Sequence, residues 1–200
     1  MLKYPWNAPI RSYTRRLRGK SDKLVLPRWP YKLELGRNSY ANDDIDVQCF
    51  RSSSTIRVGK YSSIGKCTFV VDGDHAMKFA STFPFNEFGL CPKAPENKQI
   101  KDVPKVGNDV WIADGAVIHG GVTVHDGAVV AGNAVVAMKH VPPYAVVAGN
   151  PARVVKYRFD SSFIDRFIAV RWWDMPDDFV FTQLAPLLED PNEFLLNAEN

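Results

Sequence analysis

The sequence predicts a mainly β protein whose core is a parallel β-helix built from six-residue repeats. First, the stretch from Val106 to Val136 places a branched aliphatic residue at every sixth position. Second, weaker copies of the same spacing precede it, beginning at Leu35. Third, one long segment without the repeat interrupts the pattern, and a helical pattern follows it near the C-terminus. Self-similarity at a fixed short period is typical of repeat architectures, and six-residue periods are typical of β-helices.

The central repeat divides into the blocks VGNDVW, IADGAV, IHGGVT, VHDGAV, VAGNAV and VAMKH. Each block opens on Val or Ile, and the fifth place of every full block is small or β-branched: Val110, Ala116, Val122, Ala128, Ala134. A single strand or an amphipathic helix would show a period of 2 or 3.6 instead. Three short strands then make one triangular coil, so residues about 18 positions apart stack on one another.

Composition limits the class of protein. The chain has 200 residues, 46% of them hydrophobic, and a net charge of +3. One substantial core fits this size, and so mild a charge argues against a dedicated nucleic-acid binder. No apolar run is long enough for a spanning helix, and the N-terminus lacks the features of a secretory signal. Cys49, Cys67 and Cys91 show no paired spacing, so we expect free thiols in a cytoplasmic protein.

Residues 1–32 form a basic, proline-interrupted N-terminal arm. Six cations face only Asp22: Arg11, Arg15, Arg16, Arg18, Lys20 and Lys23. A solvated arm or short helix is one interpretation. Peripheral contact with an anionic membrane surface or an acidic glycan is the other, and charge alone does not separate them.

Residues 33–157 form the predicted β-helix domain. Residues 41–55 are irregular, which predicts a distorted first coil, and the register returns at Val58 and Ile64. Gly59 and Gly65 each take the second place of a block, where we expect a corner that needs glycine's freedom in φ.

An inserted loop, residues 71–105, interrupts this domain. Such a long excursion from a regular scaffold is typical of a functional or disordered segment. It contains four phenylalanines, Phe79, Phe83, Phe85 and Phe88. These predict that the loop packs either on its own coil or on a neighbouring subunit.

Residues 158–200 form a predicted helical tail. Asp160 or Ser161 can cap a helix that carries apolar residues at helical spacing, namely Phe163, Ile164, Phe167 and Ile168. A second helix is expected after the sequence Asp174-Met175-Pro176. We expect the tail to cover the open end of the β-helix, as terminal caps do in repeat proteins.

His75, inside the insert, is the candidate catalytic residue. Histidine accepts a proton from a hydroxyl near neutral pH, although a surface histidine in a loop is the alternative. The other three histidines, His119, His125 and His140, are not spaced for one stack, so we expect no metal site within a subunit.

A basic group gathers late in the chain, at Lys139, Arg153, Lys156 and Arg158. These residues suit a phosphorylated cofactor or, alternatively, a solvated rim. No phosphate-binding glycine loop of the nucleotide-hydrolysing or dinucleotide type is present in the sequence.

The stretches GDHAMKFASTFPFNEFG, VGNDVW and GNPA, together with RWWDMP at 171–176, resemble the hexapeptide-repeat xenobiotic acetyltransferases. That family includes streptogramin and type B chloramphenicol acetyltransferases. LGRNSY and VGKYSSIG also match its pattern, and the resemblance covers residues 33–185 in the family's order. The longer, more basic arm departs from the drug-modifying members, so an antibiotic or a sugar hydroxyl of a polysaccharide precursor is an equally suitable acceptor.

The resemblance implies a left-handed β-helix, a homotrimer, and acetyl-CoA lying in a groove between neighbouring prisms. It makes His75 the general base for direct attack by a small-molecule hydroxyl. Tyr40 and Trp111 would line the acceptor pocket, and we place Phe83 of the insert there too. The implied acetyl-CoA contacts are Ala113, Ala131 and Gly132 along the pantetheine arm, with Lys139, Arg153 and Lys156 near the phosphates. A non-catalytic β-helix scaffold or binding protein is the alternative of another class.

Overall fold

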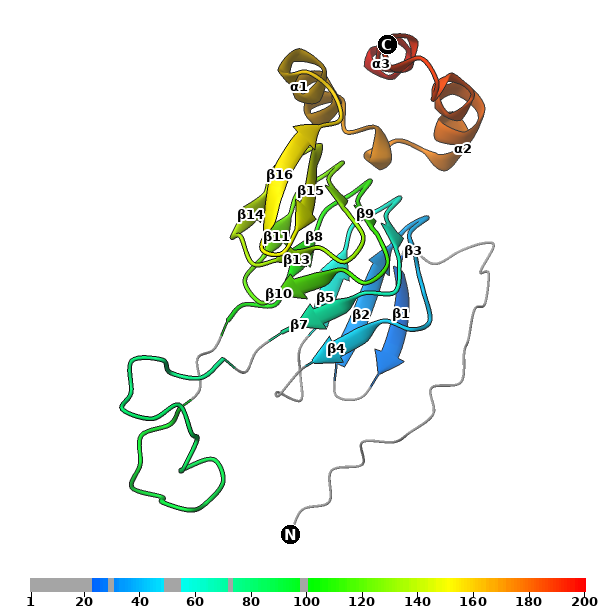
Figure 1. Cartoon of the computed structure of the whole chain (residues 1–200). Helices are drawn as coiled ribbons and strands as arrows, with labels where there is room; N and C mark the ends of the chain where they lie inside the picture. The colour runs from blue at the N-terminus through cyan, green and yellow to red at the C-terminus, as the bar shows by residue number, and fades with distance from the viewer. Residues whose placement is uncertain (1–22, 29–30, 49–54, 72–73, 98–100) are drawn as a thin grey trace.

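The chain folds as a left-handed parallel β-helix of triangular cross-section, with one loop thrown out from its side and a helical tail (Figure 1). This computed structural model describes residues 23–28, 31–48, 55–71, 74–97 and 101–200. The first part of the basic arm, residues 1–22, lies outside the described residues. The predicted fold class is confirmed.

Three sheets form the faces of the prism. Sheet A contains β1 (Lys23–Arg28), β2 (Tyr31–Gly36), β5 (Thr55–Val58), β8 (Lys105–Val106), β11 (Thr123–Val124) and β14 (His140–Val141). Sheet B contains β3 (Tyr40–Ala41), β6 (Ser63–Ile64), β9 (Trp111–Ile112), β12 (Val129–Val130), β15 (Ala145–Gly149) and β16 (Ala152–Tyr157). Sheet C contains β4 (Asp46–Gln48), β7 (Thr68–Val70), β10 (Val117–His119) and β13 (Val135–Val136). The chain visits the sheets in the order A, B, C, so each coil has an A–B, a B–C and a C–A corner.

The register agrees with an 18-residue coil in the central repeat, where Val106 pairs with Val124 and Ile112 with Val130. The first coil is longer, since Glu34 pairs with Arg57, as its irregular sequence predicted. The last coil is one residue shorter, since Val124 pairs with Val141. That shortening follows from VAMKH, which is a five-residue block.

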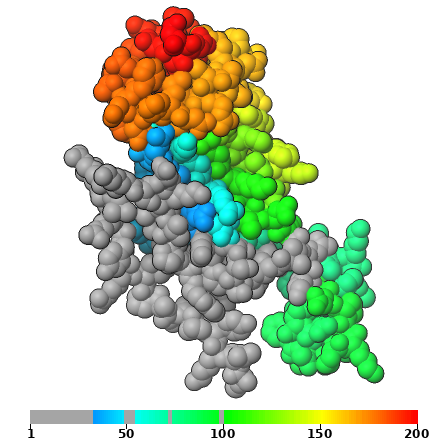
Figure 2. Space-filling model, turned by 180° about the vertical axis from the view of Figure 1, so that it is seen from behind, coloured from blue at the N-terminus to red at the C-terminus, as the bar shows by residue number. Residues whose placement is uncertain are grey.

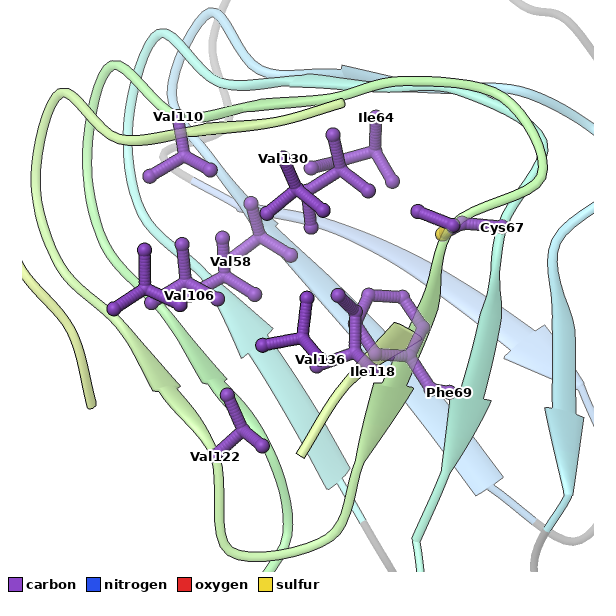
Figure 3. Close-up of a cluster of buried hydrophobic side chains, with 14 of the residues drawn as sticks. Val58, Ile64, Cys67, Phe69, Val106, Val110, Ile118, Val122, Val130 and Val136 are labelled. Atoms are coloured by element: carbon purple, nitrogen blue, oxygen red, sulfur yellow. The ribbon is translucent and has the colours of Figure 1, made fainter. Parts of the chain in front are cut away.

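The repeat openers make the core of the prism (Figure 3). Val106, Ile112, Ile118, Val124, Val130 and Val136 are all buried, as are the fifth-place residues of the same blocks. Short strands can bury only every second side chain, and the openers occupy that inward position in each strand. Full burial of a Val or Ile side chain contributes about 1.5–3 kcal/mol to folding, so the repeated opener is the main source of stability.

The glycines at the second place of a block have a different reason from the one expected. Gly59 and Gly65 do not adopt positive φ; instead a Cβ on Gly59 would lie 2.5 Å from the backbone of Gly107 in the next coil. The left-handed backbone falls further on in the same corner. At the A–B corner every coil has one such residue: Asn38, Tyr61, Asp109, Gly127 and Tyr144. Close stacking of neighbouring coils therefore selects glycine at Gly59 and Gly65.

Each end of the prism carries one antiparallel strand. At the N-terminal end β1 pairs antiparallel with β2, and at the C-terminal end β16 pairs antiparallel with β15. The arm predicted for residues 1–32 therefore contains a β-hairpin strand instead of being a solvated arm or helix throughout. Its β1 segment, KLVLPR, contains the consecutive apolar residues Leu24, Val25 and Leu26, a short apolar run that suits a strand.

The tail consists of α1 (Ser161–Val170), α2 (Asp177–Phe179) and α3 (Pro191–Glu199), with single turns η1 (Trp172–Asp174), η2 (Val180–Leu184) and η3 (Ala185–Leu187) between them. Asp160 caps α1 as expected, since its side chain accepts from the Phe163 N–H. Phe167 is buried, whereas Ile168 is exposed. The second helix starts at Asp177, directly after Pro176.

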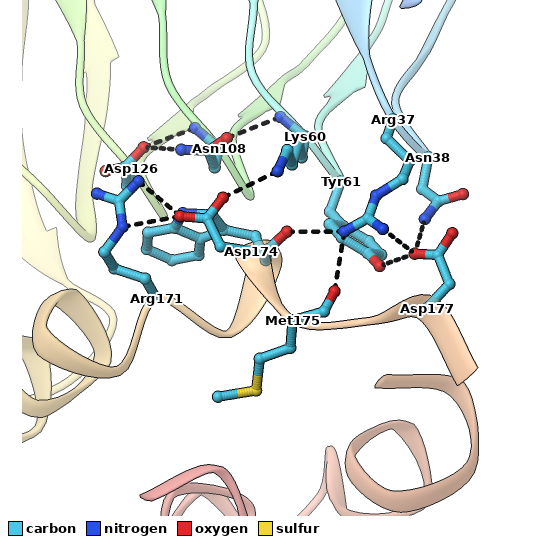
Figure 4. Close-up of polar contacts among 11 residues, drawn as sticks. Arg37, Asn38, Lys60, Tyr61, Asn108, Asp126, Arg171, Asp174, Met175 and Asp177 are labelled. Carbon is cyan, nitrogen blue, oxygen red and sulfur yellow. Dashed lines mark hydrogen bonds and ion pairs between the residues drawn. The ribbon is translucent and has the colours of Figure 1, made fainter. Parts of the chain in front are cut away.

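The tail does not cover the open end of the prism, contrary to expectation. It lies along the A–B corner and contacts coils from the first to the last (Figures 1 and 4). Near the first coil, Arg37 donates to the Met175 carbonyl at 2.9 Å. Near the last coil, the ring of Tyr144 stacks on Phe167 at 5.3 Å between centroids. Tyr61 on the second coil and Tyr144 on the last coil both stand at this corner, and the tail packs against their rings.

Two ion pairs fasten this arrangement. Lys60 Nζ lies 2.9 Å from Asp174 Oδ1, and Arg37 Nη1 lies 3.2 Å from Asp177 Oδ1. The hydroxyl of Tyr61 donates to Asp177 at 2.6 Å, and burial together with this carboxylate raises the pKa of Tyr61 to about 12. Tyr61 therefore stays a neutral donor across the physiological range.

Candidate functional site

The outer face of sheet B carries a row of side chains that includes two of the predicted site residues. Tyr40 pairs with Ser63, and Ser63 pairs with Trp111, so the three residues occupy neighbouring strands in register. The row continues through Val129 and Val146. Tyr40 and Trp111 are 65% and 55% exposed and stand two strands apart, about 10 Å. Sheet B therefore presents two aromatic rings outward with a serine hydroxyl between them.

A groove of about 560 Å³ runs beside this row. It is lined by Trp111, Ala113, Val129, Ala131, Gly132, Val146, Lys156, Arg158 and Phe159. Five residues predicted for the site thus meet here: Trp111, Ala113, Ala131, Gly132 and Lys156. The small residues at the B–C corner leave the floor open, and one lysine stands at the rim.

Arg158 and Phe159 complete one wall of the groove. Arg158 belongs to the basic group that the sequence suggested for a phosphorylated cofactor, whereas Phe159 was not among the predicted site residues. Arg158 Nη1 donates to Asp109 Oδ2 and to the Gly127 carbonyl, both at 2.9 Å. Its guanidinium also lies over the rings of Tyr144 and Phe159. Burial raises the pKa of Asp109, and the Arg158 guanidinium opposes that rise. The late cluster of cations in the sequence indicated Arg158. Because Asp109 pairs with its guanidinium, however, Arg158 lines the groove and does not offer an unpaired positive charge.

The remaining predicted cations do not gather in one place. Arg153 lies on β16 opposite Ala148, near the B–C corner. Lys139 lies between β13 and β14, at the C–A corner, where its carbonyl accepts from the Thr123 N–H. Within one chain, Lys139 is therefore separated by a face of the prism from Arg153 and Lys156. Nearness in the sequence does not bring cations together when the chain turns a corner between them.

The insert leaves the prism at the C–A corner, between β7 and β8 (Figure 1). Both of its ends pass the same glycine: a Cβ on Gly120 would lie 2.6 Å from the Val71 carbonyl and 2.9 Å from Lys101 Cβ. The Gly121 N–H donates to the Asp102 carbonyl at 2.6 Å. His75 follows Val71 by four residues and is exposed. In a triangular prism the C–A corner stands opposite sheet B, so the structure does not bring His75 to the groove of its own chain.

Three of the four phenylalanines of the insert pack on one another and not on their own coil. Phe83 contacts Phe85 edge-on at 4.9 Å and stacks on Phe88 at 5.6 Å between centroids. All four remain exposed, Phe88 by 69%. In the space-filling view the described part of the insert forms a lobe apart from the described prism (Figure 2). Phe83, the third predicted acceptor residue, is therefore far from Tyr40 and Trp111 of the same chain.

Two histidines do come together, contrary to the sequence argument. His125 Nε2 lies 3.4 Å from His140 Nδ1. His140 pairs with Thr123, so it is a diagonal neighbour of His125 on the outer face. The sequence argument placed His140 away from His125 because it assumed an 18-residue coil, whereas the last coil has 17 residues. Among the described residues no three His, Cys, Asp or Glu side chains are grouped to hold a metal ion.

Comparison with known proteins shows which proteins this chain resembles. Residues 104–137 match the family model described as bacterial transferase hexapeptide (six repeats). A chloramphenicol acetyltransferase of Agrobacterium fabrum is 33% identical over 186 residues, which cover 86% of this chain and 85% of that protein. A probable macrolide acetyltransferase of Lysinibacillus sphaericus is 34% identical over 148 residues, covering 70% and 81%.

Among solved structures, the polySia specific acetyltransferase NeuO superimposes with a TM-score of 0.50 at 19% identity, covering 84% of this chain and 64% of that one. At that identity the likeness shows the fold alone. No helix in the described part of the chain is long and apolar enough to cross a membrane. The repeat, the matched family model and the extended similarity to acetyltransferases agree, and the chain belongs to the hexapeptide-repeat acetyltransferase family.

Proposed function

We propose that this acetyltransferase moves the acetyl group of acetyl-CoA to a hydroxyl of a small molecule, with His75 as general base, at a site shared between two copies of the chain. The observation that carries the proposal is the separation of its parts. The groove lies on sheet B, whereas the insert with His75 leaves from the opposite corner. A complete site therefore needs a groove from one copy and an insert from another.

A cyclic homotrimer satisfies this requirement, because each copy then gives its insert to one neighbour and receives one from the other. The insert is suited to such an exchange, because it stands away from its own prism (Figure 1). Its phenylalanines are also exposed. Phe83 of one copy would then come near Tyr40 and Trp111 of the next. Lys139 would likewise belong to an acetyl-CoA site different from that of Arg153 and Lys156.

The groove fits the acetyl-CoA that the family uses. Its floor of Ala113, Ala131 and Gly132 lets a narrow pantetheine chain lie against the backbone. Lys156 at the rim supplies a positive charge for phosphate oxygens. Acetyl-CoA supplies an activated acetyl thioester.

His75 would accept the proton of the acceptor hydroxyl as the oxygen bonds to the acetyl carbon. The C–S bond breaks, and the same proton then passes to the departing thiolate. No covalent acetyl-enzyme is required, because no nucleophilic side chain is paired with His75 among the described residues. Tyr40 and Trp111 would hold the acceptor by stacking on its apolar or sugar face.

The acceptor is an antibiotic hydroxyl or a sugar hydroxyl of a polysaccharide precursor. The similarity to chloramphenicol and macrolide acetyltransferases supports the first. Two exposed aromatic rings with a hydroxyl between them suit either. Release of free thiol from acetyl-CoA should be followed with chloramphenicol, a macrolide, a streptogramin and nucleotide-activated sugars as acceptors.

His75→Ala is expected to lower kcat at least about 100-fold, because direct attack then lacks its base. The melting temperature should still rise with CoA concentration in the variant as in the wild type, because the groove is untouched. Thiol release near the wild-type rate would remove His75 from the mechanism. If CoA at millimolar concentration did not stabilise even the wild type, the chain would be a scaffold and not an enzyme.

A further inference from the structure

Both residues that flank His75 are fixed by residues from the far end of the insert. On one side, Asp74 forms an ion pair with Lys101. On the other, the Ala76 N–H donates to Asn97 Oδ1 at 2.6 Å. His75 is thus held between two anchored neighbours, although the insert stands out from the prism.

Asn97 is the centre of this arrangement. It is 4% exposed, in a loop whose other side chains are largely exposed. Its own N–H donates to Glu87 Oε1 at 2.7 Å, and its Nδ2 donates to the Ser81 carbonyl at 3.3 Å. One side chain and its backbone amide therefore connect Ala76, Ser81 and Glu87. Buried amide side chains with satisfied partners make a loop adopt one conformation.

The His75 ring has no hydrogen-bond partner within the described part of the chain. The location of the imidazole is therefore set by its backbone, which is held on one side by the β-bridge at Asp74 and on the other by the Ala76–Asn97 hydrogen bond. A backbone shift at residue 76 moves the imidazole directly. Displacement of a catalytic group by about 1 Å can cost about 100-fold in rate.

We propose that Asn97 is the positioning residue for His75, through the hydrogen bond from the Ala76 N–H to its Oδ1. This inference deepens the proposed function and rests on His75 being the base. Asn97 touches neither acceptor nor acetyl-CoA in the argument; it acts on the backbone beside the imidazole. The insert is then a folded arm that carries an oriented base to the neighbouring copy.

The test uses three variants of the full-length protein. Asn97→Leu keeps the size and removes the acceptor oxygen, whereas Asn97→Asp keeps an oxygen in its place. Asn86→Ala is the matched control: it removes an asparagine of the same insert whose Nδ2 donates to the Ala94 carbonyl at 2.8 Å, away from His75. We measure kcat, KM for acetyl-CoA and the hydrogen exchange rate of the Ala76 amide.

Asn97→Leu should lower kcat by about 10- to 100-fold with KM for acetyl-CoA unchanged, because the groove is on another face. Its Ala76 amide should exchange faster than in the wild type. Asn97→Asp should recover most of both, and Asn86→Ala should keep the wild-type values of both.

Equal losses of kcat in Asn97→Leu and Asn86→Ala would overturn the proposal, since they would show general loosening of the insert. Wild-type kcat in Asn97→Leu would overturn it too. The outcome is separable from failure of the proposed function. If His75→Ala kept full activity, the base assignment would be wrong, whereas a protected Ala76 amide in the wild type alone would still report the Asn97 contact.

Discussion

At the scale of single residues, exposure separates the side chains that we propose to act in the site from those that form the core. Trp111 is more than half exposed in a strand whose other residue, Ile112, is fully buried. Exposing an indole on a sheet face forgoes the burial that aromatic residues normally provide. Trp111 is therefore placed to bury its ring against a ligand or a second copy, whereas Ile112 supplies stability.

The cysteines give a test of burial at this scale. Cys67 is 2% exposed, and burial, with Asp114 nearby, raises the pKa of its thiol from 9.0 to about 12. Cys91 is exposed on the insert. In a Cys49→Ser background, we expect one thiol to react with a disulfide reagent at once and the second only after unfolding. Reactivity follows the thiolate, and the raised pKa lowers the thiolate fraction of Cys67 by about a thousandfold relative to an ordinary thiol.

Cys91→Ser serves as the control, since it should abolish the rapid phase of labelling. Rapid labelling of two thiols in the native Cys49→Ser protein would show that the B–C corner of the second coil, which contains Cys67, opens readily. That result would contradict the close packing of Cys67.

At the scale of elements, the position of the insert depends on the contacts at Gly120, where the insert leaves the prism. Both ends of the loop cross Gly120, where a methyl group would meet the Val71 carbonyl at 2.6 Å. Gly120→Ala should therefore displace the base of the insert and lower kcat by tenfold or more, about the cost expected of a misplaced catalytic group. The melting temperature should fall only slightly, because the buried openers of the prism are unchanged. Steady-state kinetics and thermal melting measure the two effects.

Gly89→Ala is the control for this change. It adds the same methyl group within the insert, at a φ of 69° that strains the backbone, but the methyl meets no atom within 4 Å. It should keep kcat within about twofold of the wild type if contact at the root is what matters. A comparable loss in both variants would assign the effect to flexibility of the whole insert.

The sequence predicted those elements that repeat, and failed where the repeat ends. The openers at every sixth residue specified the strands, the coil and the core, because each branched side chain has one inward position. β1 was hidden in a segment whose charge suggested an arm, since a strand that pairs with β2 needs no repeat of its own. The course of the tail along the A–B corner depended on Tyr61 and Tyr144, whose aromatic rings stand on different coils and give no local signal.

The sequence indicated the residues that line the groove, but not how the groove and the insert are placed relative to each other. Ala113, Ala131 and Gly132 meet beside Trp111 because stacking at 18 residues aligns them. The position of His75 relative to this groove followed only from the corner at which the insert leaves. Asn97 gave no signal because it is distant in sequence from His75, and a buried asparagine in a polar loop looks like any other loop residue.

At the scale of the whole molecule, a shared site predicts that two inactive variants restore activity when they are mixed. Ala131→Trp should block the groove and leave the insert intact, whereas His75→Ala does the reverse. Unfolded together in equal amounts and refolded, they should give about a quarter of wild-type activity in a randomly mixed cyclic oligomer, since half of the inserts and half of the grooves are functional. Thiol release measures the recovery.

Each variant refolded alone provides the control and should remain inactive. Mixed protein that showed no recovery, with mass measurements confirming oligomers of both chains, would mean that every site is made within one chain. The structure would then require the insert to fold back around the prism.

The two antiparallel strands have a consequence for solubility. A parallel coil whose rim is bare offers its backbone amides and carbonyls to the rim of another molecule, and end-to-end fibres follow. β1 reverses the strand direction at the edge of sheet A at one end, and β16 does so at the edge of sheet B at the other. An incoming parallel coil therefore meets the wrong pattern of hydrogen-bonding groups on one face at each end. The two hairpin strands thus hinder end-to-end polymerisation of the solenoid through sheets A and B.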